Sequence, residues 1–287
     1  MSFCPSGRIA NPSFVVSSAR AARSFVFAAQ RRGLAFLLVA LLLVFSSGCK
    51  SRSAKNVLLV SAAMSLRDAF TEAGRRFERR HPGKRVRFNF ASSGTLATQI
   101  IRGAPVDVFA SASQHHMNRV ARKGLVLPKH RHDFARNTLV VIQPRNHGRR
   151  LRTVEDLRMA GKIAIGNPRT VPAGRYARAM LKHHKLWSPL RKHLVYGEHI
   201  RQVLDYVARN EVDAGLVYGT DYRLRKKDVV LVASAAPQSH PPIIYPVSVL
   251  KETRKRKLAL LFVQFLLSAE GRRILEKHGF QPVRAAR

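Results

Sequence analysis

Short apolar runs alternate along this chain with segments whose apolar residues recur at helical spacing. A run at 56–60 precedes an amphipathic stripe over 66–77, and the stripe ends before Pro82 and Gly83, which break a helix. The same alternation then repeats to the C-terminus. The predicted strands cover 56–60, 86–90, 106–113, 138–144, 162–168, 193–197, 214–219, 228–233 and 243–250. The predicted helices cover 66–77, a segment ending near 102, 117–121, 153–159, 171–184, 203–207, 258–266 and one more that closes the chain.

This order of elements predicts an α/β protein. Strands that are separated by helices pair in parallel, and the helices cover both faces of the sheet. A chain of 287 residues is long enough to form two cores of moderate size. Ligands of open α/β sheets bind at the carboxyl ends of the strands, so we expect candidate chemistry where strands lead into helices.

The N-terminus has the pattern of a secretory signal. An apolar run at 34–45 follows two arginines and precedes small residues that end in Gly48 and Cys49. The run is too short to span a bilayer as a helix, which needs about 20 residues. The small residues predict a lipoprotein cleavage site with Cys49 as the lipid-bearing first residue, although Ser46 stands where leucine is usual. Plain signal cleavage and an uncleaved anchor are the alternatives.

The charge of the chain is unusual for a globular protein. It is +36 at pH 7, and loss of 1–48 leaves 47 basic residues against 16 acidic ones, a net +31. Such a charge suits a nucleic-acid partner, but an export signal argues against a genomic role. Cys4 is lost with the signal and Cys49 is modified, so the mature domain is expected to have no disulfide.

Four predicted strand-to-helix turns place small or backbone-exposing residues at the start of a helix. These turns are 61–65, 91–95, 171–174 and 197–200. The first backbone N–H groups of a helix have no partner within it and the helix dipole is positive there, and together these features favour an anion. A serine adds a hydroxyl donor. Because few carboxylates lie in these turns, they predict a shared anion site.

Each serine taken alone also has a structural explanation. Ser65 precedes Asp68 by three residues, which is the pattern of a capping box, and Ser93 has the character of a helix N-cap. The recurrence of donor-rich turns is what favours binding over capping. Ser92 and Thr95 are expected only to shape their turn.

Five motifs, in this order, resemble the periplasmic molybdate-binding proteins of ABC importers. They are AAMSLRDAF, FASSGTLATQI, GAPVDVFASAS, VPAGRYA and GLVYGTD. The resemblance runs from about Val57 to Val283, and VPAG with VYG downstream is its most specific pair. It implies the two-lobe α/β fold of type II periplasmic binding proteins. Each lobe then has a mainly parallel sheet flanked by helices, and the chain crosses between lobes near 137–141 and 234–245.

The resemblance also implies a division of the chain and a place for it in the cell. Residues 1–48 are the leader and signal peptide, 49–55 a lipid-anchored linker, 56–138 plus 240–287 lobe one, and 139–239 lobe two. We expect a monomer in the periplasm or cell envelope, held to the membrane by its lipid, that is not an enzyme. It delivers its ligand to an inner-membrane ABC permease.

In that family a tetrahedral oxyanion is held between the lobes by hydroxyls and backbone amides. Carried over by motif, the ligand-binding residues are Ser65 and Ser93 through hydroxyl and N–H, Ala173 and Ile200 through N–H, and Tyr218 through its phenol. Ile200 lies in the loosest of the motifs. Met64 stands where the family usually has a smaller residue, which bears on the size of the cavity.

The chemistry of the ligand agrees with this set of donors. Molybdate and tungstate carry no proton at neutral pH and only accept hydrogen bonds, so a site made of donors suits either one. Hydrogen phosphate keeps a proton and needs an acceptor, whereas sulfate is separated only by cavity size. We expect no cofactor and no bound metal cation.

Three other functions stay open on the sequence. The first is a binding protein for another tetrahedral oxyanion such as sulfate. The second is a basic surface protein that binds polyanions such as DNA or heparin, without need of the serines. The third, an enzyme acting on an oxyanion ester, lacks a nucleophile–base pair. The histidine pairs at 115–116 and 183–184 lack metal-ligand spacing, and Asp107 and Asp221 are expected to be structural or hinge acids.

Overall fold

The computed structural model describes residues 56–283, all of which belong to one compact unit of the chain. The predicted signal peptide, the linker at 49–55 and Cys49 lie outside the described residues and stay predictions. Within the described part of the chain, no helix has both the length and the apolar character needed to cross a membrane.

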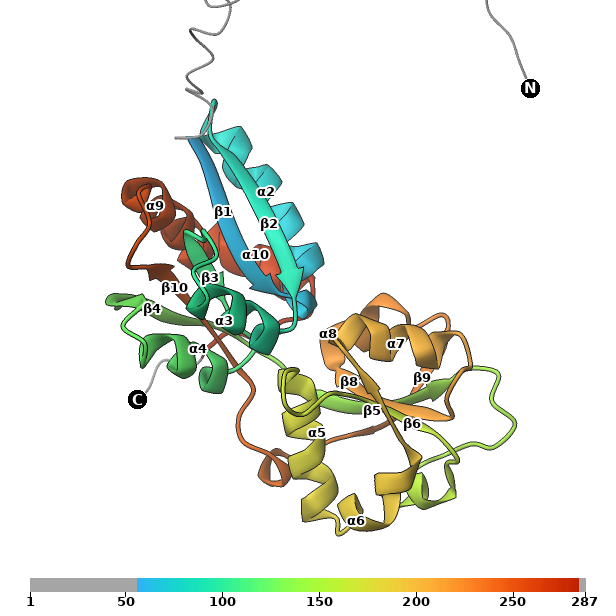
Figure 1. The fold of residues 1–287 in the computed structure, drawn as a ribbon. Helices are drawn as coiled ribbons and strands as arrows, with labels where there is room; N and C mark the ends of the chain where they lie inside the picture. The colour runs from blue at the N-terminus through green and yellow to red at the C-terminus, as the bar shows by residue number, and fades with distance from the viewer. Residues whose placement is uncertain (1–55, 284–287) are drawn as a thin grey trace, which may run out of the picture. The chain divides into compact units, whose positions relative to one another are not determined.

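One lobe is built on a five-stranded sheet in the order β2-β1-β3-β10-β4 (Figure 1). Its strands are β1 (Val57–Ala63), β2 (Arg85–Ala91), β3 (Val108–Ala110), β4 (Val126–Arg136) and β10 (Ile244–Leu250). β1 pairs in parallel with β2 and β3, and β10 runs antiparallel between β3 and β4. All strands except β10 therefore point the same way, which confirms a mainly parallel sheet.

The other lobe repeats this plan in the order β7-β6-β8-β5-β9. Its strands are β5 (Leu139–Pro144), β6 (Ile163–Gly166), β7 (Leu194–Gly197), β8 (Ala214–Tyr218) and β9 (Val229–Ser234). β6 pairs in parallel with β7 and β8, and β5 runs antiparallel to β8 and β9. In each sheet the reversed strand is the one that the chain enters directly after crossing between the lobes.

Helices flank both sheets. Those of lobe one are the 3₁₀ turn η2 (Met64–Leu66), α2 (Arg67–Arg80), α3 (Ser93–Ile101), α4 (Gln114–Ala121), α9 (Arg256–Leu267) and α10 (Ala269–Lys277). Those of lobe two are η3 (Glu155–Met159), α5 (Pro172–His183), α6 (Trp187–Leu190), η4 (Arg191–His193), α7 (Ile200–Ala208) and α8 (Gly219–Leu224). The short η5 (Pro237–Ser239) lies in the second crossing, which joins β9 to β10.

The amphipathic stripe of α2 explains how lobe one closes its core. Phe70 and Phe77 are fully buried, and both rings meet Phe262 of α9 edge-on, with centroids 6.3 and 5.3 Å apart. Phe88 of β2 completes the contact, with its centroid 6.0 Å from that of Phe70. Each buried ring stabilises the fold by about 1.5–3 kcal/mol. The apolar stripe that the sequence predicts on α2 therefore packs this N-terminal helix against the C-terminal helix α9.

Most predicted elements are confirmed, with shifted ends, but β4, α6 and α8 were not predicted, and one predicted helix is wrong. The sequence pattern predicts no element over 126–136, which forms β4, an edge strand; exposed polar residues such as Lys129 and Asp133 interrupt its periodicity. α8 was missed because it follows β8 directly and its six residues, Gly219–Leu224, are too few to show a helical pattern of apolar residues. The helix expected over 153–159 is the 3₁₀ turn η3, and at its start Thr153 and Asp156 exchange two hydrogen bonds between backbone N–H and side-chain oxygen.

Candidate functional site

A cavity between the two lobes brings together the strand-to-helix turns that stood out in the sequence. About 200 Å³ of space there is free of protein atoms, part of it open to solvent. All five residues assigned by motif line it, together with six neighbours. The lining residues are Ala63, Met64, Ser65, Ser92, Ser93, Ala112, Val171, Pro172, Ala173, Ile200 and Tyr218.

The two sheets supply these residues from the carboxyl ends of their strands. β1 ends at Ala63 and leads into η2, and β2 ends at Ala91 and leads into α3. In lobe two, β6, β7 and β8 lead into α5, α7 and α8. Because parallel strands end at the same edge of a sheet, their turns converge, and the same edge of each lobe faces the cavity.

Three helices place backbone N–H groups at this cavity. Ser93 and Ile200 are the first residues of α3 and α7, and Ala173 is the second residue of α5. N–H groups at these positions have no acceptor within their own helix. All three residues are buried, with at most 3% of their surface exposed. The cavity therefore lies at the positive end of three helix dipoles, which favours an anion.

The serines do not cap their helices as the sequence suggested. The N-cap of α3 is Ser92, whose Oγ accepts a hydrogen bond from Thr95 N–H at 3.3 Å, whereas Ser93 Oγ accepts one from Ala112 N–H at 2.9 Å. The capping box predicted for Ser65 and Asp68 is wrong. The 3₁₀ turn η2 places Leu66 at the N-cap of α2, where no side chain caps the helix.

Tyr218 contributes a buried phenol to the cavity. It is 1% exposed, and its phenol oxygen has no hydrogen-bond partner among the described residues. Burial raises the pKa of the phenol well above its usual value of 10, so the group stays protonated and can donate. A buried hydroxyl without a partner costs about 1–3 kcal/mol, a cost that an acceptor in the cavity would remove.

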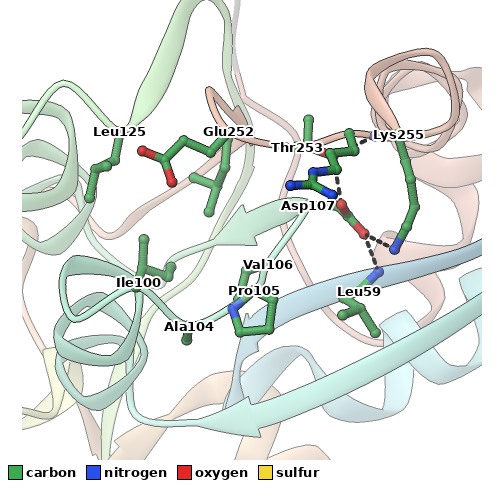
Figure 2. Close-up of a pocket in the computed structure, with 13 residues that line it drawn as sticks. Leu59, Ile100, Ala104, Pro105, Val106, Asp107, Leu125, Glu252, Thr253 and Lys255 are labelled. Atoms are coloured by element: carbon green, nitrogen blue, oxygen red, sulfur yellow. Dashed lines mark hydrogen bonds and ion pairs between the residues drawn. The ribbon is translucent and has the colours of Figure 1, made fainter. Parts of the chain in front are cut away.

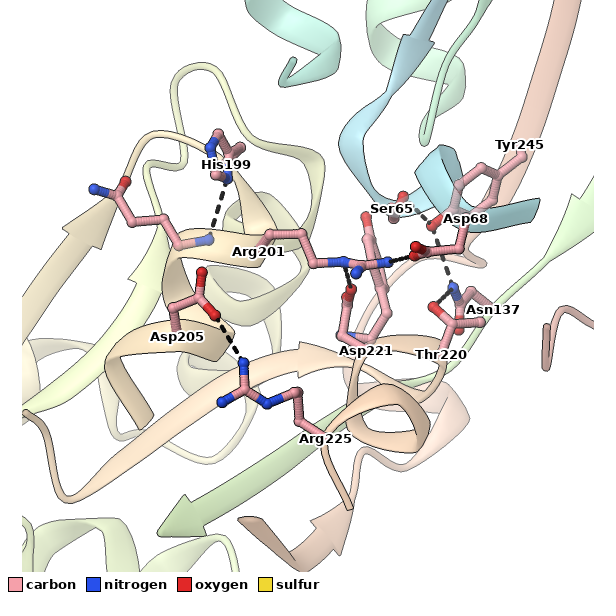
Figure 3. A network of polar contacts seen from close by, with 12 residues as sticks. Ser65, Asp68, Asn137, His199, Arg201, Asp205, Thr220, Asp221, Arg225 and Tyr245 are labelled. Carbon is pink, nitrogen blue, oxygen red and sulfur yellow. Dashed lines mark hydrogen bonds and ion pairs between the residues drawn. The ribbon is translucent and has the colours of Figure 1, made fainter. Parts of the chain in front are cut away.

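The lining carries no charged side chain among the described residues. An ionic network lies beside the cavity, in which Arg201 of α7 meets Asp221 of α8 at 2.8 Å and Asp68 of α2 at 2.6 Å (Figure 3). Burial raises the pKa of Asp221 to about 6, although Arg201 acts in the opposite direction. The expected role of Asp221 as a structural acid agrees with this placement.

Two contacts join the lobes at the rim of the cavity. One is the ion pair of Arg201 and Asp68, and the other is the hydrogen bond from Gly94 N–H to Thr170 C=O, 2.9 Å long. A Cβ atom on Gly94 would lie 2.4 Å from that carbonyl oxygen, so only glycine permits this approach. The sequence predicts neither contact, because each joins two residues that lie far apart along the chain.

A larger cavity lies within lobe one, around Asp107, with about 990 Å³ of space free of protein atoms, part of it open to solvent (Figure 2). Asp107 is buried and accepts hydrogen bonds from Leu59 N–H at 2.8 Å, from the Thr253 hydroxyl at 2.6 Å and from Lys255 Nζ at 3.1 Å. These bonds join β1 to the segment after β10. Asp107 is thus a structural acid, as expected.

No metal site is evident in the described part of the chain. Within residues 56–283, no three His, Cys, Asp or Glu side chains gather in a way that could hold a cation. His116 lies buried on α4, and burial lowers the pKa of its ring to about 3. His184 pairs instead with Glu155 at 2.8 Å.

A family model described as "Bacterial extracellular solute-binding protein" matches residues 58–281, which include every residue of the cavity. The chain belongs to this family. The description of the family gives the binding of a solute as its role.

Similar proteins support the assignment to solute-binding proteins. The chain is 37% identical over 252 residues to YvgL of Bacillus subtilis, for which the name proposes a substrate-binding lipoprotein of an ABC transporter. That match covers 86% of this chain and 94% of YvgL. The molybdate-binding protein ModA of Haemophilus influenzae is 32% identical, with 80% of this chain and 92% of ModA covered.

Among solved structures, the periplasmic molybdate-binding protein of Azotobacter vinelandii superposes with a TM-score of 0.70. The match covers 79% of this chain and 100% of that one at 22% identity, and so it shows the shared fold. The two-lobe α/β architecture is therefore confirmed, with two crossings between the lobes.

Proposed function

We propose that this solute-binding protein captures molybdate, or tungstate, between its lobes and delivers it to an ABC permease. The observation that carries the proposal is the unpartnered, buried phenol of Tyr218 at a cavity rimmed by helix N-termini. The names of similar proteins support the choice of ligand, since several relatives are molybdate-binding proteins.

The ligand is held by hydrogen bonds alone in this proposal. Ser65 and Ser93 give hydroxyl and N–H donors, Ala173 and Ile200 give N–H donors, and Tyr218 gives its phenol. Hydrogen bonds to a charged group are worth about 1.5–3 kcal/mol each, so several of them can hold a dianion without a cation beside it. Donors alone suit molybdate and tungstate equally. The lobes close on the ligand because both contact it only in the closed form.

The place of the protein in the cell follows from the same proposal. A lipid on Cys49 holds the protein to the membrane, and residues 49–55 link the anchor to lobe one. Lobe one comprises 56–138 plus 240–287, and lobe two comprises 139–239. The protein acts as a monomer outside the cytoplasm and presents its closed form to the permease. Mass spectrometry of the mature N-terminus tests the lipid.

The decisive test of the ligand is a panel of anions read by thermal unfolding. Molybdate at about 100 times its Kd stabilises the folded protein by about 2.7 kcal/mol, which raises the melting temperature. Sulfate and phosphate at the same concentration are expected to raise it less. A melting temperature that excess molybdate leaves unchanged contradicts the proposal, and a larger shift with sulfate reassigns the ligand.

Matched serine variants locate the binding site. Ser65→Ala, Ser93→Ala and Tyr218→Phe each remove one donor, and each is expected to reduce the affinity for molybdate by about 10-fold or more. Ser92→Ala is the control, because Ser92 lines the same cavity but caps α3 through Thr95 N–H. It is expected to lower the melting temperature without ligand and to leave the affinity unchanged.

A further inference from the structure

A chain of buried hydrogen bonds leads from the cavity to the first crossing between the lobes. Ser65 Oγ lies 3.0 Å from the phenol oxygen of Tyr245 on β10 (Figure 3). Asn137, in the crossing between β4 and β5, places its Nδ2 3.2 Å from the same phenol oxygen and 3.0 Å from Thr220 Oγ1 of α8. All four side chains are buried.

The direction of these hydrogen bonds is set at Asn137. The backbone N–H of Thr138, which can only donate, lies 2.9 Å from Asn137 Oδ1. The opposite orientation of the amide would point Nδ2 at that N–H and bring two donors together. Nδ2 therefore faces Tyr245 and Thr220, and because it has no lone pair to offer, it donates to both hydroxyl oxygens.

The phenol of Tyr245 passes this direction on to Ser65. Tyr245 has a single hydroxyl hydrogen, and its oxygen already accepts from Asn137. If Ser65 donated to it as well, the Tyr245 hydrogen would have no partner in a fully buried place, because the neighbouring Tyr218 oxygen forms no hydrogen bond with it; the cost would be about 1–3 kcal/mol. Tyr245 therefore donates to Ser65 Oγ. The hydrogen of Ser65 is left for the cavity.

The Ser93 hydroxyl is also held as a donor, by a single hydrogen bond from a backbone N–H. Its Oγ accepts from Ala112 N–H at 2.9 Å, and a backbone N–H can only donate, so the Ser93 hydrogen is also left over. With the unpartnered phenol of Tyr218, three hydroxyls thus offer hydrogens to the cavity. Of the three, only Ser65 depends on a relay of other side chains.

We propose that Tyr245 and Asn137 are specificity-determining positioning residues that hold Ser65 as a donor and so exclude oxyanions that carry a proton. The proposal rests on the proposed function, since it concerns the anion bound at the same cavity. A protonated oxyanion must donate its own hydrogen, and a serine hydroxyl that is free to rotate can accept it. When Ser65 already accepts from Tyr245, it presents its own hydrogen to the cavity. That hydrogen faces the hydrogen of the protonated oxyanion, and the two repel each other.

Two variants change the relay in different ways. Tyr245→Phe removes the donor to Ser65 with little change of shape, so the Ser65 hydroxyl becomes free to rotate. Asn137→Asp reverses the relay, because a carboxylate accepts from Thr138 N–H, from the Thr220 hydroxyl and from the Tyr245 hydroxyl. Tyr245 must then accept from Ser65, and Ser65 presents lone pairs to the cavity.

The experiment compares molybdate with hydrogen arsenate at pH 8. Both are tetrahedral dianions there, but only arsenate carries a proton, so the negative charge added by Asn137→Asp cancels in the ratio of their affinities. Purified full-length protein is titrated calorimetrically with molybdate, and arsenate is measured by competition. The ratio is expected to shift toward arsenate by about 10-fold or more in Tyr245→Phe, and further in Asn137→Asp.

The control is Thr220→Val, which removes the other partner of the Asn137 amide and leaves the branch to Ser65 in place. Its affinity ratio is expected to equal that of the unaltered protein. Arsenate that competes no better relative to molybdate in Asn137→Asp than in the unaltered protein overturns the relay. Failure of the unaltered protein to bind molybdate overturns the proposed function instead, so the two failures are distinguishable.

Discussion

At the scale of single residues, buried polar atoms determine the properties of the cavity more than exposed charges do. The chain has a large positive charge, yet the residues that line the cavity are neutral and act through their hydrogens. Tyr218 has a hydroxyl with no partner among the described residues, and His116 has two such ring nitrogens. The proposed ligand would be a partner for the first, whereas His116 is not among the residues that line the cavity.

His116 is expected to make the protein sensitive to acid. Burial lowers the pKa of its ring to about 3, with His115, Arg175 and Arg119 acting in the same direction. The unfolded chain takes up a proton near pH 6.5 that the folded protein does not take up, so stability is lost as the pH falls through the window from about 6.5 to about 3. The loss is about 1.4 kcal/mol per pH unit.

The variant His116→Leu tests this contribution. It is expected to be at least as stable as the unaltered protein at pH 7.5, because two unpartnered nitrogens disappear. At pH 5 it gains a further advantage of about 2 kcal/mol in the free energy of unfolding. Urea denaturation at both pH values measures the difference, and packing effects cancel between them. A difference that is the same at both pH values contradicts the assignment.

At the scale of elements, the start of α3 serves both the ligand and the contact between the lobes. Ser93 faces the cavity, and the next residue, Gly94, donates to the Thr170 carbonyl of the other lobe. The absence of a side chain at Gly94 is what permits this approach. The glycine of the SSGT motif is thus explained by the closure of the lobes rather than by a turn.

Gly94→Ala is expected to oppose closure while leaving each lobe folded. The added methyl group would lie 2.4 Å from the Thr170 oxygen, and relief of such overlap costs about 1–3 kcal/mol, or about 5- to 150-fold in affinity for molybdate. Calorimetric titration measures the affinity. Gly148→Ala is the control, since a Cβ atom there meets nothing within 4 Å. Unchanged affinity in Gly94→Ala would show that the contact does not limit closure.

At the scale of the whole molecule, an ion pair between the lobes lies beside the cavity. Arg201 of lobe two reaches Asp68 of lobe one at 2.6 Å, and Asp68 is 39% exposed in its side chain. Partly exposed pairs contribute about 0.2–1 kcal/mol and weaken in salt. Arg201 itself is a poor site for a test, because its removal leaves Asp221 buried without its partner.

Asp68→Asn is therefore the variant to use. It is expected to speed the release of molybdate by about 2- to 5-fold at low salt, and by less at high salt, because the ion pair exists only while the lobes are closed. Stopped-flow release measures the rate. Glu72→Gln is the control: it removes the same charge from the same helix, but Glu72 pairs with Lys277 and His278 within lobe one. Equal effects of the two variants would indicate a general effect of charge.

Much of the fold was predictable because its signals are local. The stripe of α2 and the apolar runs of the inner strands depend on neighbours along the chain, so pattern alone identified them. β4 was missed because an edge strand keeps polar residues on its open side. The capping box of Ser65 and Asp68 failed for a different reason, since a 3₁₀ turn intervenes and Arg201 of the other lobe binds Asp68.

The sequence by itself determined the α/β alternation, the two-lobe fold through its motifs, and the five residues that meet at the cavity. Only the tertiary structure decided which way their hydrogen bonds point and how the lobes meet. Ser65 and Tyr245 are 180 positions apart, and Gly94 meets Thr170 across the lobes. The physical reason is that periodicity and capping depend on neighbours along the chain. The polarity of a buried hydroxyl depends instead on partners that only folding brings within 3 Å.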